Sequence, residues 1–161
     1  MSDGGHSGGA GRRSFEVRTR SEAPVADVWP LLGEARRWSE WSFLTGSRLE
    51  REGRPDPDGV GAVRRFTSFG IGSREEVVAW EPPHHLGYTI LSGFPVRGYR
   101  ADVVLRPDEA GGGTVITWSA TFDERFPGTG RLTTLALRAV IRRLAGAAAA
   151  YADRLAEQAR P

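Results

Sequence analysis

The sequence of 161 residues contains no cysteine, no lysine and no asparagine. The absence of cysteine excludes disulfides, thiolate catalysis and cysteine-ligated metal sites, and a cytoplasmic location is the simplest expectation for such a chain. The 22 basic residues are all arginine, and 20 acidic residues balance them to a net charge of +2. Paired arginines are scattered along the chain and are not concentrated among stacking aromatic residues, so we expect no nucleic-acid partner.

Long apolar runs and common catalytic motifs are also missing. No segment approaches the roughly 20 apolar residues that span a bilayer, so we expect no membrane insertion. The sequence has no nucleophile elbow, P-loop or dinucleotide fingerprint. His84 and His85 follow two prolines in a turn, and only His6 lies elsewhere. We therefore expect no metal site and no cofactor.

Length and composition favour one domain. A chain of this length with 39% hydrophobic residues suits a single domain that buries a sizeable core. We expect this domain to span residues 14–158. Residues 1–13 are rich in glycine and serine and lack an apolar signal-peptide core, so we expect them to form a disordered leader.

Alternation of apolar and polar residues, with glycine and proline at the breaks, predicts the order of elements. The first part of the chain is predicted to hold a strand over 15–20, a helix from about Pro24 to Gly33, a short helix over 35–38 and a strand over 45–52. Five antiparallel strands follow between residues 60 and 122, separated by turns at 70–72, 81–84, 93–95 and 110–113.

A long helix is predicted from an N-cap at Thr129 to about Gln158. Its apolar residues recur at three- and four-residue steps, so one stripe of the helix must lie on the sheet. The alanine run over 145–150 lets the helix lie close to the strands. The bulkier N-terminal half, which includes Leu135 and Ala139, is expected to stand off and cover a cavity.

Strand pairing predicts which side chains meet inside, because opposite residues of antiparallel strands share a face. The last hairpin supplies the starting register, with Leu105 opposite Ile116, Val103 opposite Trp118, Ala101 opposite Ala120 and Tyr99 opposite Phe122. All eight residues are apolar or aromatic, and the other face holds arginine, aspartate, serine and threonine, as a solvated face should.

The same register, carried back across the earlier turns, predicts a polar pair inside the sheet. Across the turn at 93–95, Tyr88 is placed opposite Tyr99, so Leu86, Tyr88 and Ile90 point inward. Across the turn at 81–84, Val78 is placed opposite Tyr88 and Glu76 opposite Ile90. Across the turn at 70–72, Val63 is placed opposite Val78 and Arg65 opposite Glu76. A slip of one residue would invert this assignment, and a bulge at the glycine-rich turn over 70–72 would produce one.

These elements amount to an α+β helix-grip layout, in which a curved antiparallel sheet of about seven strands wraps around a long C-terminal helix, with two short helices after the first strand. The chain resembles the START-like SRPBCC superfamily, particularly its polyketide cyclase/dehydrase-like branch, over roughly residues 14–158. The resemblance is carried by the segments 23–29, 37–41, 59–66, 75–83 and 86–88, followed by Trp118.

The resemblance implies a deep cavity between sheet and long helix for a lipid, a polyketide or a similar hydrophobic molecule. It places Trp41 and Phe43 at the entrance. Members of the superfamily include cyclases, carriers and ligand sensors, so the fold does not select one chemistry. The expected ligand-binding residues are Trp41, Phe43, Val63, Arg65, Glu76, Val78, Tyr88, Ile90, Tyr99, Trp118, Leu135 and Ala139.

Three functions stay open from the sequence. The first is a non-catalytic protein that binds a mainly apolar ligand, with Arg65 and Glu76 at the polar end. The second is a polyketide cyclase or aromatase-like enzyme, in which Arg65, Glu76 and Tyr88 stabilise an enolate and move protons. The third is an interaction module without an occupied cavity. No histidine or cysteine lies on the predicted inner face, which favours binding. We expect a monomer or a homodimer.

Overall fold

The computed structural model describes residues 11–159, so most of the predicted leader lies outside the described residues. One sheet of seven strands carries the fold, and every neighbouring pair of strands is antiparallel, in the order β1-β7-β6-β5-β4-β3-β2. The elements are β1 (Arg13–Ser21), α1 (Val25–Gly33), η1 (Ala35–Arg37), α2 (Trp38–Trp41), β2 (Gly46–Arg51), β3 (Val63–Ser68), β4 (Ile71–Glu81), β5 (His85–Ser92), β6 (Val96–Pro107), β7 (Thr114–Glu124) and α3 (Gly130–Gln158).

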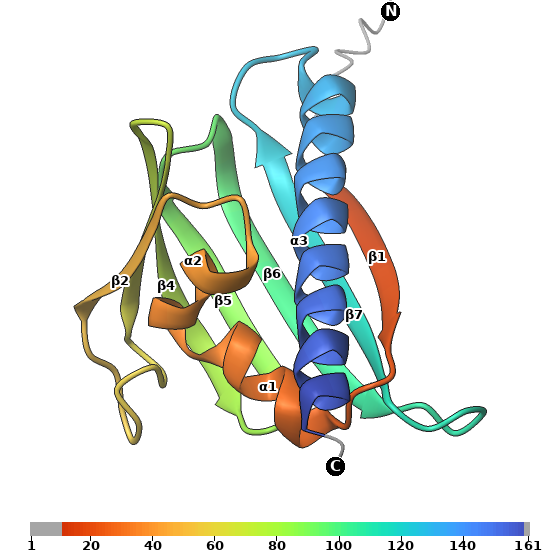
Figure 1. Ribbon diagram of the computed structural model, residues 1–161. Helices are drawn as coiled ribbons and strands as arrows, with labels where there is room; N and C mark the ends of the chain where they lie inside the picture. Colours follow the sequence, from red (N-terminus) through yellow and green to blue (C-terminus); the bar gives the residue numbers. More distant parts are fainter. Residues whose placement is uncertain (1–10, 160–161) are drawn as a thin grey trace, which may run out of the picture.

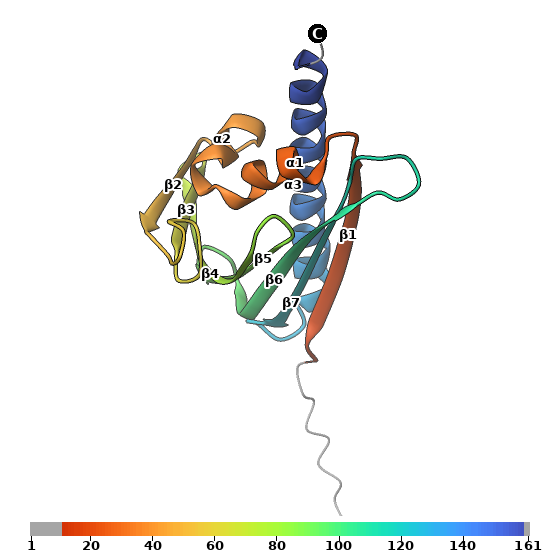
Figure 2. The same cartoon turned by 90° about the horizontal axis from the view of Figure 1, so that it is seen from below.

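The sheet curves around α3, and α1 and α2 close one side of the structure (Figures 1 and 2). This arrangement is the helix-grip fold expected from the sequence. Two hydrogen bonds from indole groups connect α2 to α1. Trp38 Nε1 donates to the carbonyl of Leu32 at 3.0 Å, and Trp41 Nε1 donates to that of Leu31 at 2.9 Å. Both carbonyls belong to the last turn of α1, where no helical partner remains for them. None of the helices between residues 11 and 159 is long and apolar enough to cross a membrane.

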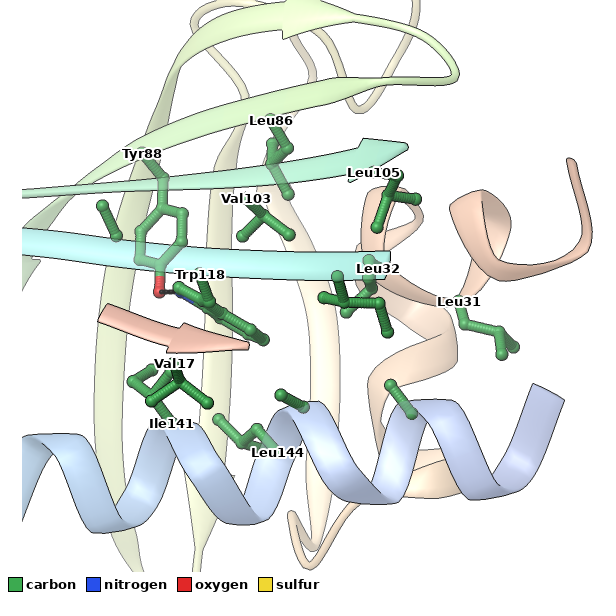
Figure 3. Packing of buried hydrophobic residues seen from close by; sticks show 14 of the residues in the cluster. Val17, Leu31, Leu32, Leu86, Tyr88, Val103, Leu105, Trp118, Ile141 and Leu144 are labelled. Carbon is green, nitrogen blue, oxygen red and sulfur yellow. Dashed lines mark hydrogen bonds between the residues drawn. The ribbon is translucent and has the colours of Figure 1, made fainter. Parts of the chain in front are cut away.

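The two halves of α3 pack differently, as the sequence predicts. Its C-terminal half buries Ala145, Ala148, Ala149 and Ala152, and these small side chains let the helix approach the sheet and α1 closely. The carboxylate of Asp153 fixes this end, because its Oδ1 accepts hydrogen bonds from Ser21 Oγ at 2.6 Å and from the Glu22 amide at 2.8 Å. The core continues through the larger residues of Figure 3.

The N-terminus of α3 is capped by a different residue from the one predicted. Thr129 occupies the N-cap position, but its side chain makes no capping hydrogen bond. Its Oγ1 donates instead to the carbonyl of Phe126 at 2.7 Å. The carboxylate of Glu124 accepts hydrogen bonds from the amide of Gly130 at 2.7 Å and from that of Gly128, in the preceding turn, at 3.3 Å, so an acidic residue at the end of β7 satisfies the first amide of the helix.

The predicted register is confirmed in part for the last hairpin, where Leu105 pairs with Ile116, Val103 with Trp118 and Ala101 with Ala120. The fourth predicted pair, Tyr99 with Phe122, is not formed, because the register between β6 and β7 shifts between Arg97 and Arg100. The rings of Tyr99 and Phe122 nevertheless stack, with centroids 6.5 Å apart.

The pairing of β5 with β6 is two residues away from the prediction. Tyr88 lies opposite Ala101 and not opposite Tyr99, and Leu86 lies opposite Val103. A shift of two residues keeps each side chain on its predicted face, since side chains alternate with a period of two. Leu86 and Tyr88 are accordingly buried.

The prediction is wrong for β3 and β4, where a bulge inverts the faces. Near the turn between β4 and β5, Ala79 pairs with Gly87, as the predicted register requires. The register then shifts, and Val77 pairs with Tyr88, which leaves Val78 as the extra residue. Beyond this point the inward residues of β4 are Val77 and Glu75 in place of Val78 and Glu76. In β3, Arg64 then pairs with Glu75, and Arg65 lies opposite Arg74.

Candidate functional site

A cavity of about 310 Å³ lies between the concave face of the sheet and the N-terminal half of α3. Its apolar wall is formed by side chains from strands β3 to β6 and the turns between them, from α2 and the segment after it, and from α3. A volume of this size suits a small molecule, because ligand pockets usually measure about 300 to 1,000 Å³. The residues around the cavity are Trp38, Phe43, Leu44, Phe66, Ser68, Phe69, Ile71, Gly72, Ser73, Glu75, Tyr88, Ile90, Gly93, Phe94, Tyr99, Leu137, Val140, Ile141 and Leu144.

The cavity forms because the N-terminal half of α3 is separated from the sheet by bulky side chains, as the sequence predicts. Leu137, Ile141 and Leu144 are buried at the sheet side of α3, and Val140 is half-buried beside them. These four side chains line the cavity, whereas the alanines that follow on the same helix do not. The change from bulky to small side chains along one helix therefore separates a cavity end from a closely packed end.

One carboxylate faces this apolar space. Glu75 is buried on the inner face of β4 and lines the cavity. Its Oε2 accepts a hydrogen bond from Nη2 of Arg64 at 2.9 Å, which makes a buried ion pair between neighbouring strands. Charges in such surroundings are tolerated only when they are paired.

Aromatic rings surround the cation of this pair. Arg64 is fully buried, and its guanidinium carbon lies 5.0 Å from the ring centre of Trp38, 5.4 Å from that of Phe66 and 5.2 Å from that of Tyr88. Rings at these distances stabilise a cation through their negative faces. Nη1 also donates to the carbonyl of Leu32 at 3.4 Å, while Nε has no hydrogen-bond partner within residues 11–159.

Burial affects the protonation of the groups around the cavity. It raises the pKa of the Glu75 carboxyl, and the positive charge of Arg64 opposes this rise. Burial also raises the pKa of Tyr88 and of Tyr99, and the nearby Glu75 adds to both shifts. The two phenols therefore keep their protons at neutral pH and are available as hydrogen-bond donors.

The two tyrosines lie side by side at the cavity. Tyr88 OH accepts a hydrogen bond from Trp118 Nε1 at 3.1 Å, which orients the phenol (Figure 3). The Tyr99 ring lies 6.2 Å from that of Tyr88, and both rings line the cavity. The site thus offers phenolic donors beside one carboxylate, surrounded by apolar wall.

The structure places four of the twelve predicted ligand-binding residues around the cavity: Phe43, Tyr88, Ile90 and Tyr99. Trp41 and Trp118 are buried in the core and do not line it. Leu135 and Ala139 point away from the sheet and are exposed, because the stripe that faces the cavity runs through Leu137, Val140, Ile141 and Leu144.

The predicted polar pair is not formed. The partly exposed Arg65 approaches Glu50 at 4.0 Å, while Glu76 accepts a hydrogen bond from Arg51 at 3.1 Å. Val63 is buried outside the main core, and Val78 is partly exposed. All four predicted residues lie on the face opposite to the cavity, because the bulge in β4 shifts the register by one residue.

Sequence reasoning missed Arg64 and Glu75 because each belongs to a doublet. Arg64-Arg65, Glu75-Glu76 and Val77-Val78 all offer the same residue type to either face, so the alternation alone does not choose between them. One signal was present in β3: Phe66 is in phase with Arg64 and not with Arg65. A large aromatic residue on the core face favours the register that the structure shows.

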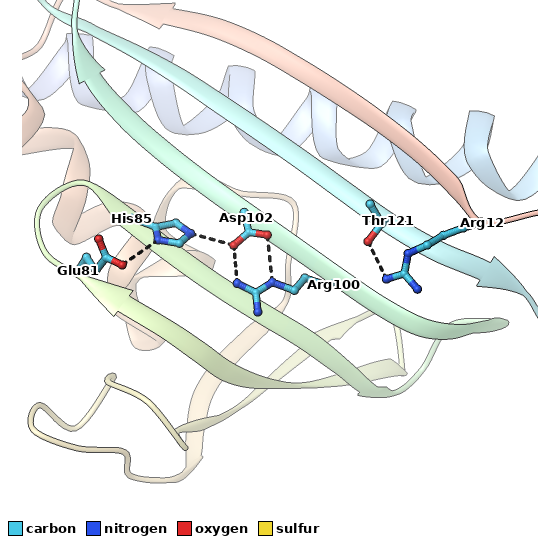
Figure 4. A network of polar contacts seen from close by, with 6 residues as sticks. All are labelled: Arg12, Glu81, His85, Arg100, Asp102 and Thr121. Atoms are coloured by element: carbon cyan, nitrogen blue, oxygen red, sulfur yellow. Dashed lines mark hydrogen bonds and ion pairs between the residues drawn. The ribbon is translucent and has the colours of Figure 1, made fainter.

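The outer face of the sheet carries a separate polar network (Figure 4). Asp102 accepts two hydrogen bonds from Arg100, at 2.8 and 3.1 Å, and lies 2.8 Å from Nε2 of His85. The hydrogen bonds from Arg100 are the main reason that the pKa of Asp102 is lowered. These groups satisfy one another on a solvated surface, and residues 11–159 contain no group of three or more side chains suited to hold a metal ion.

Comparisons with known proteins agree on the fold. The profile of the family described as polyketide cyclase / dehydrase and lipid transport matches residues 12–160. Among solved structures, the protein XoxI from Bacillus cereus superposes with a TM-score of 0.71 at 17% identity, over 87% of this chain and 94% of that one. Ara h 8.0201 superposes with a TM-score of 0.70 at 16% identity, over 88% and 98% of the two chains.

A third solved structure is the di-domain ARO/CYC BexL from the BE-7585A biosynthetic pathway. It superposes with a TM-score of 0.69 at 20% identity, over 93% of this chain and 51% of BexL, so this chain spans about half of that protein. At these identities the likeness shows the fold alone. No protein of curated function matches the chain in sequence.

The buried pair leads to a prediction about stability. We expect Arg64→Met to reduce the free energy of unfolding by about 3 to 5 kcal/mol at neutral pH, because Glu75 is then buried without its counter-charge. The matched control is Arg51→Met, which breaks the exposed pair with Glu76 and should cost no more than about 1 kcal/mol from the charge interaction. Chemical denaturation of both variants makes the measurement. Equal losses would contradict the placement of Arg64 inside.

The same pair predicts a dependence on pH. Because the pKa of Glu75 is raised above 4.5 in the folded protein, the folded state binds its proton more tightly, and stability from this group is lost as pH rises through the raised value. In Arg64→Met nothing opposes the burial, so this loss is larger. We expect the stability gap between wild type and Arg64→Met to widen as pH rises from about 4 to 7. A gap that is constant across this range would argue against the coupling.

Proposed function

The chain belongs to the polyketide cyclase/dehydrase and lipid transport family, and we propose that its cavity binds a mainly apolar small molecule with one polar end. The polar end contacts the carboxyl of Glu75 and the phenol of Tyr99, while the chain or ring system lies among Phe66, Ile90 and Val140. This role replaces the predicted one for Arg65 and Glu76. The observation that carries the proposal is a buried carboxylate that lines a mainly apolar cavity.

The arrangement of Arg64 and Glu75 supports binding rather than a purely structural role. Arg64 is enclosed by rings and does not line the cavity, whereas its partner Glu75 does. The cation therefore acts from behind the carboxylate and holds it in place. A ligand hydroxyl or a protonated ligand group can then donate to Glu75, and a ligand carbonyl can accept from a tyrosine. Pockets commonly combine apolar walls with a few such groups.

A cavity-filling variant tests this function. We expect Val140→Phe to weaken binding of the neutral apolar dye Nile red by about tenfold or more, because the larger ring occupies the cavity. The matched control, Val78→Phe, adds the same volume on the opposite face of the sheet and should leave dye affinity unchanged. Dye fluorescence titration makes the measurement, with circular dichroism to verify folding.

Two results would contradict the binding function. The first is equal dye affinity in Val140→Phe, Val78→Phe and wild type, since the dye would then bind elsewhere. The second is a native mass, for protein purified from its own host, that equals the bare chain in a preparation that also binds no dye. A co-purified molecule lost on denaturation would instead give the mass of the natural ligand.

A cyclase-like enzyme is the second candidate, favoured by the raised pKa of Glu75 beside two protonated tyrosines and by the family match. In this case Glu75 exchanges protons with the substrate, and Tyr99 donates to an enolate oxygen. We expect Glu75→Gln to lower turnover of a linear poly-β-keto substrate by about 10²- to 10⁴-fold, with Glu76→Gln as the control on the outer face. Absence of turnover by the wild type would exclude this candidate for that substrate.

A further inference from the structure

Large apolar side chains are exposed at the end of the molecule that holds the cavity mouth, in the region of the β3–β4 turn and on the outer side of α3. Phe69, in the turn between β3 and β4, and Ile71, the first residue of β4, are 86% and 74% exposed, and both line the cavity. Leu132 and Leu135, in the first turns of α3, are 75% and 65% exposed. Single exposed apolar residues are ordinary, but a group of this size at one end of the molecule indicates an interaction surface.

The backbone holds one of these side chains outward. Phe69 has a φ of 49°, in the left-handed region that costs an aromatic residue conformational energy, and Gly70 follows with a φ of 85°. Structures keep such a conformation only where their surroundings require it. Here the turn presents the phenyl ring to solvent, where it contributes nothing to the core.

Uncompensated positive charge lies beside the apolar group. The first half of α3 carries Arg131, Arg138, Arg142 and Arg143, and no acidic residue occurs from 130 to 152. The four arginines are exposed, and none forms an ion pair with another of the residues 11–159. The guanidinium of Arg143 lies over the ring of Phe43, another residue of the cavity wall, at 4.7 Å.

These features lie at one end of the molecule. The β3–β4 turn, the β5–β6 turn and the N-terminus of α3 all occupy the upper end in Figure 1, with the closely packed alanine half of α3 at the lower end. The cavity wall includes residues from both turns and from the helix. Phe69 and Ile71 therefore lie at the cavity mouth, and the leucines and arginines lie on the outer side of the helix that forms one wall of it.

From this combination we propose that the cavity mouth docks reversibly onto the surface of an anionic lipid bilayer. Phe69, Ile71, Leu132 and Leu135 enter the boundary between head groups and acyl chains, and the arginines contact lipid phosphates. This proposal rests on the proposed function, because a docked mouth lets an apolar ligand pass between bilayer and cavity without crossing water. The contact is peripheral and requires no spanning segment.

Charge favours a bilayer over a second copy of the chain as the occupant of this surface. In a two-fold symmetric dimer through the mouth, the patch that carries the four arginines would face the same patch of the other copy, and the proximity of like charges opposes association. An anionic surface instead attracts every one of them. Apolar side chains next to arginines are also the composition of helices that lie in a membrane interface.

Vesicle co-sedimentation tests the apolar part of the surface. We expect the wild type to bind vesicles of phosphatidylcholine with 30% phosphatidylglycerol, and Leu132→Ser/Leu135→Ser to bind at least about tenfold more weakly. The matched control is Val60→Ser/Leu155→Ser, which removes two exposed apolar side chains away from the mouth and should bind like the wild type. None of these four residues lines the cavity, so Nile red binding should be retained in both variants.

Vesicle binding by Arg131→Gln/Arg138→Gln tests the electrostatic part. We expect this variant to lose affinity and to show a weaker dependence on salt than the wild type, because fewer charges meet the lipid phosphates. The control, Arg18→Gln/Arg106→Gln, removes two charges from the outer face of the sheet and should behave like the wild type.

Three results would overturn the docking proposal. They are no binding to anionic vesicles, equal binding to pure phosphatidylcholine, and a dimer by light scattering that Leu132→Ser/Leu135→Ser abolishes, which would make a second copy the occupant. The vesicles contain no added ligand, so the two proposals fail separately. Vesicle binding without Nile red binding refutes the cavity function, and Nile red binding without vesicle binding refutes the docking.

Discussion

The ion pair between Arg64 and Glu75 is the interaction on which the inner face of the sheet depends. It joins β3 to β4 inside the core, where an unpaired charge is costly. Trp38, Phe66 and Tyr88 pack around the guanidinium, so the pair also positions three large rings. Through its other partner, the carbonyl of Leu32, Arg64 connects the sheet to the end of α1. One buried arginine thus links the sheet, the first helix and the wall of the cavity.

The cavity exists because the side chains that face the sheet become smaller from the N-terminal to the C-terminal half of α3. Alanines bring the C-terminal half close to β1 and α1, and Asp153 fastens that end to the chain after β1. At the other half, larger side chains keep the helix away from the curved strands, and the space between them is left open. The same half exposes leucines and arginines on its outer side. A single helix therefore supplies the packed base, one cavity wall and one side of the mouth.

Four of the eight misplaced residues of the predicted site, Val63, Arg65, Glu76 and Val78, result from one local irregularity. Turn chemistry gave the correct pairing at the start of the β4–β5 hairpin, where Ala79 meets Gly87. One extra residue at Val78 then moved every earlier residue of β4 to the other face. Because arginine, glutamate and valine each occur as doublets there, the inverted assignment still looked consistent. The prediction of a basic residue and a carboxylate inside was correct in kind, but each was placed one position too late in the chain.

The order of the elements, the helix-grip layout, the packed and open halves of α3 and most of the last hairpin could all be predicted from the sequence. These features follow from periodicity and turn residues, which act over short stretches of chain. Which arginine and which glutamate are buried, and that Trp118 orients Tyr88 and does not line the cavity, became clear only from the packing of the folded chain. A bulge depends on packing between strands and has no local signature at Val77-Val78, so the face of each doublet is settled only when the sheet closes around the helix.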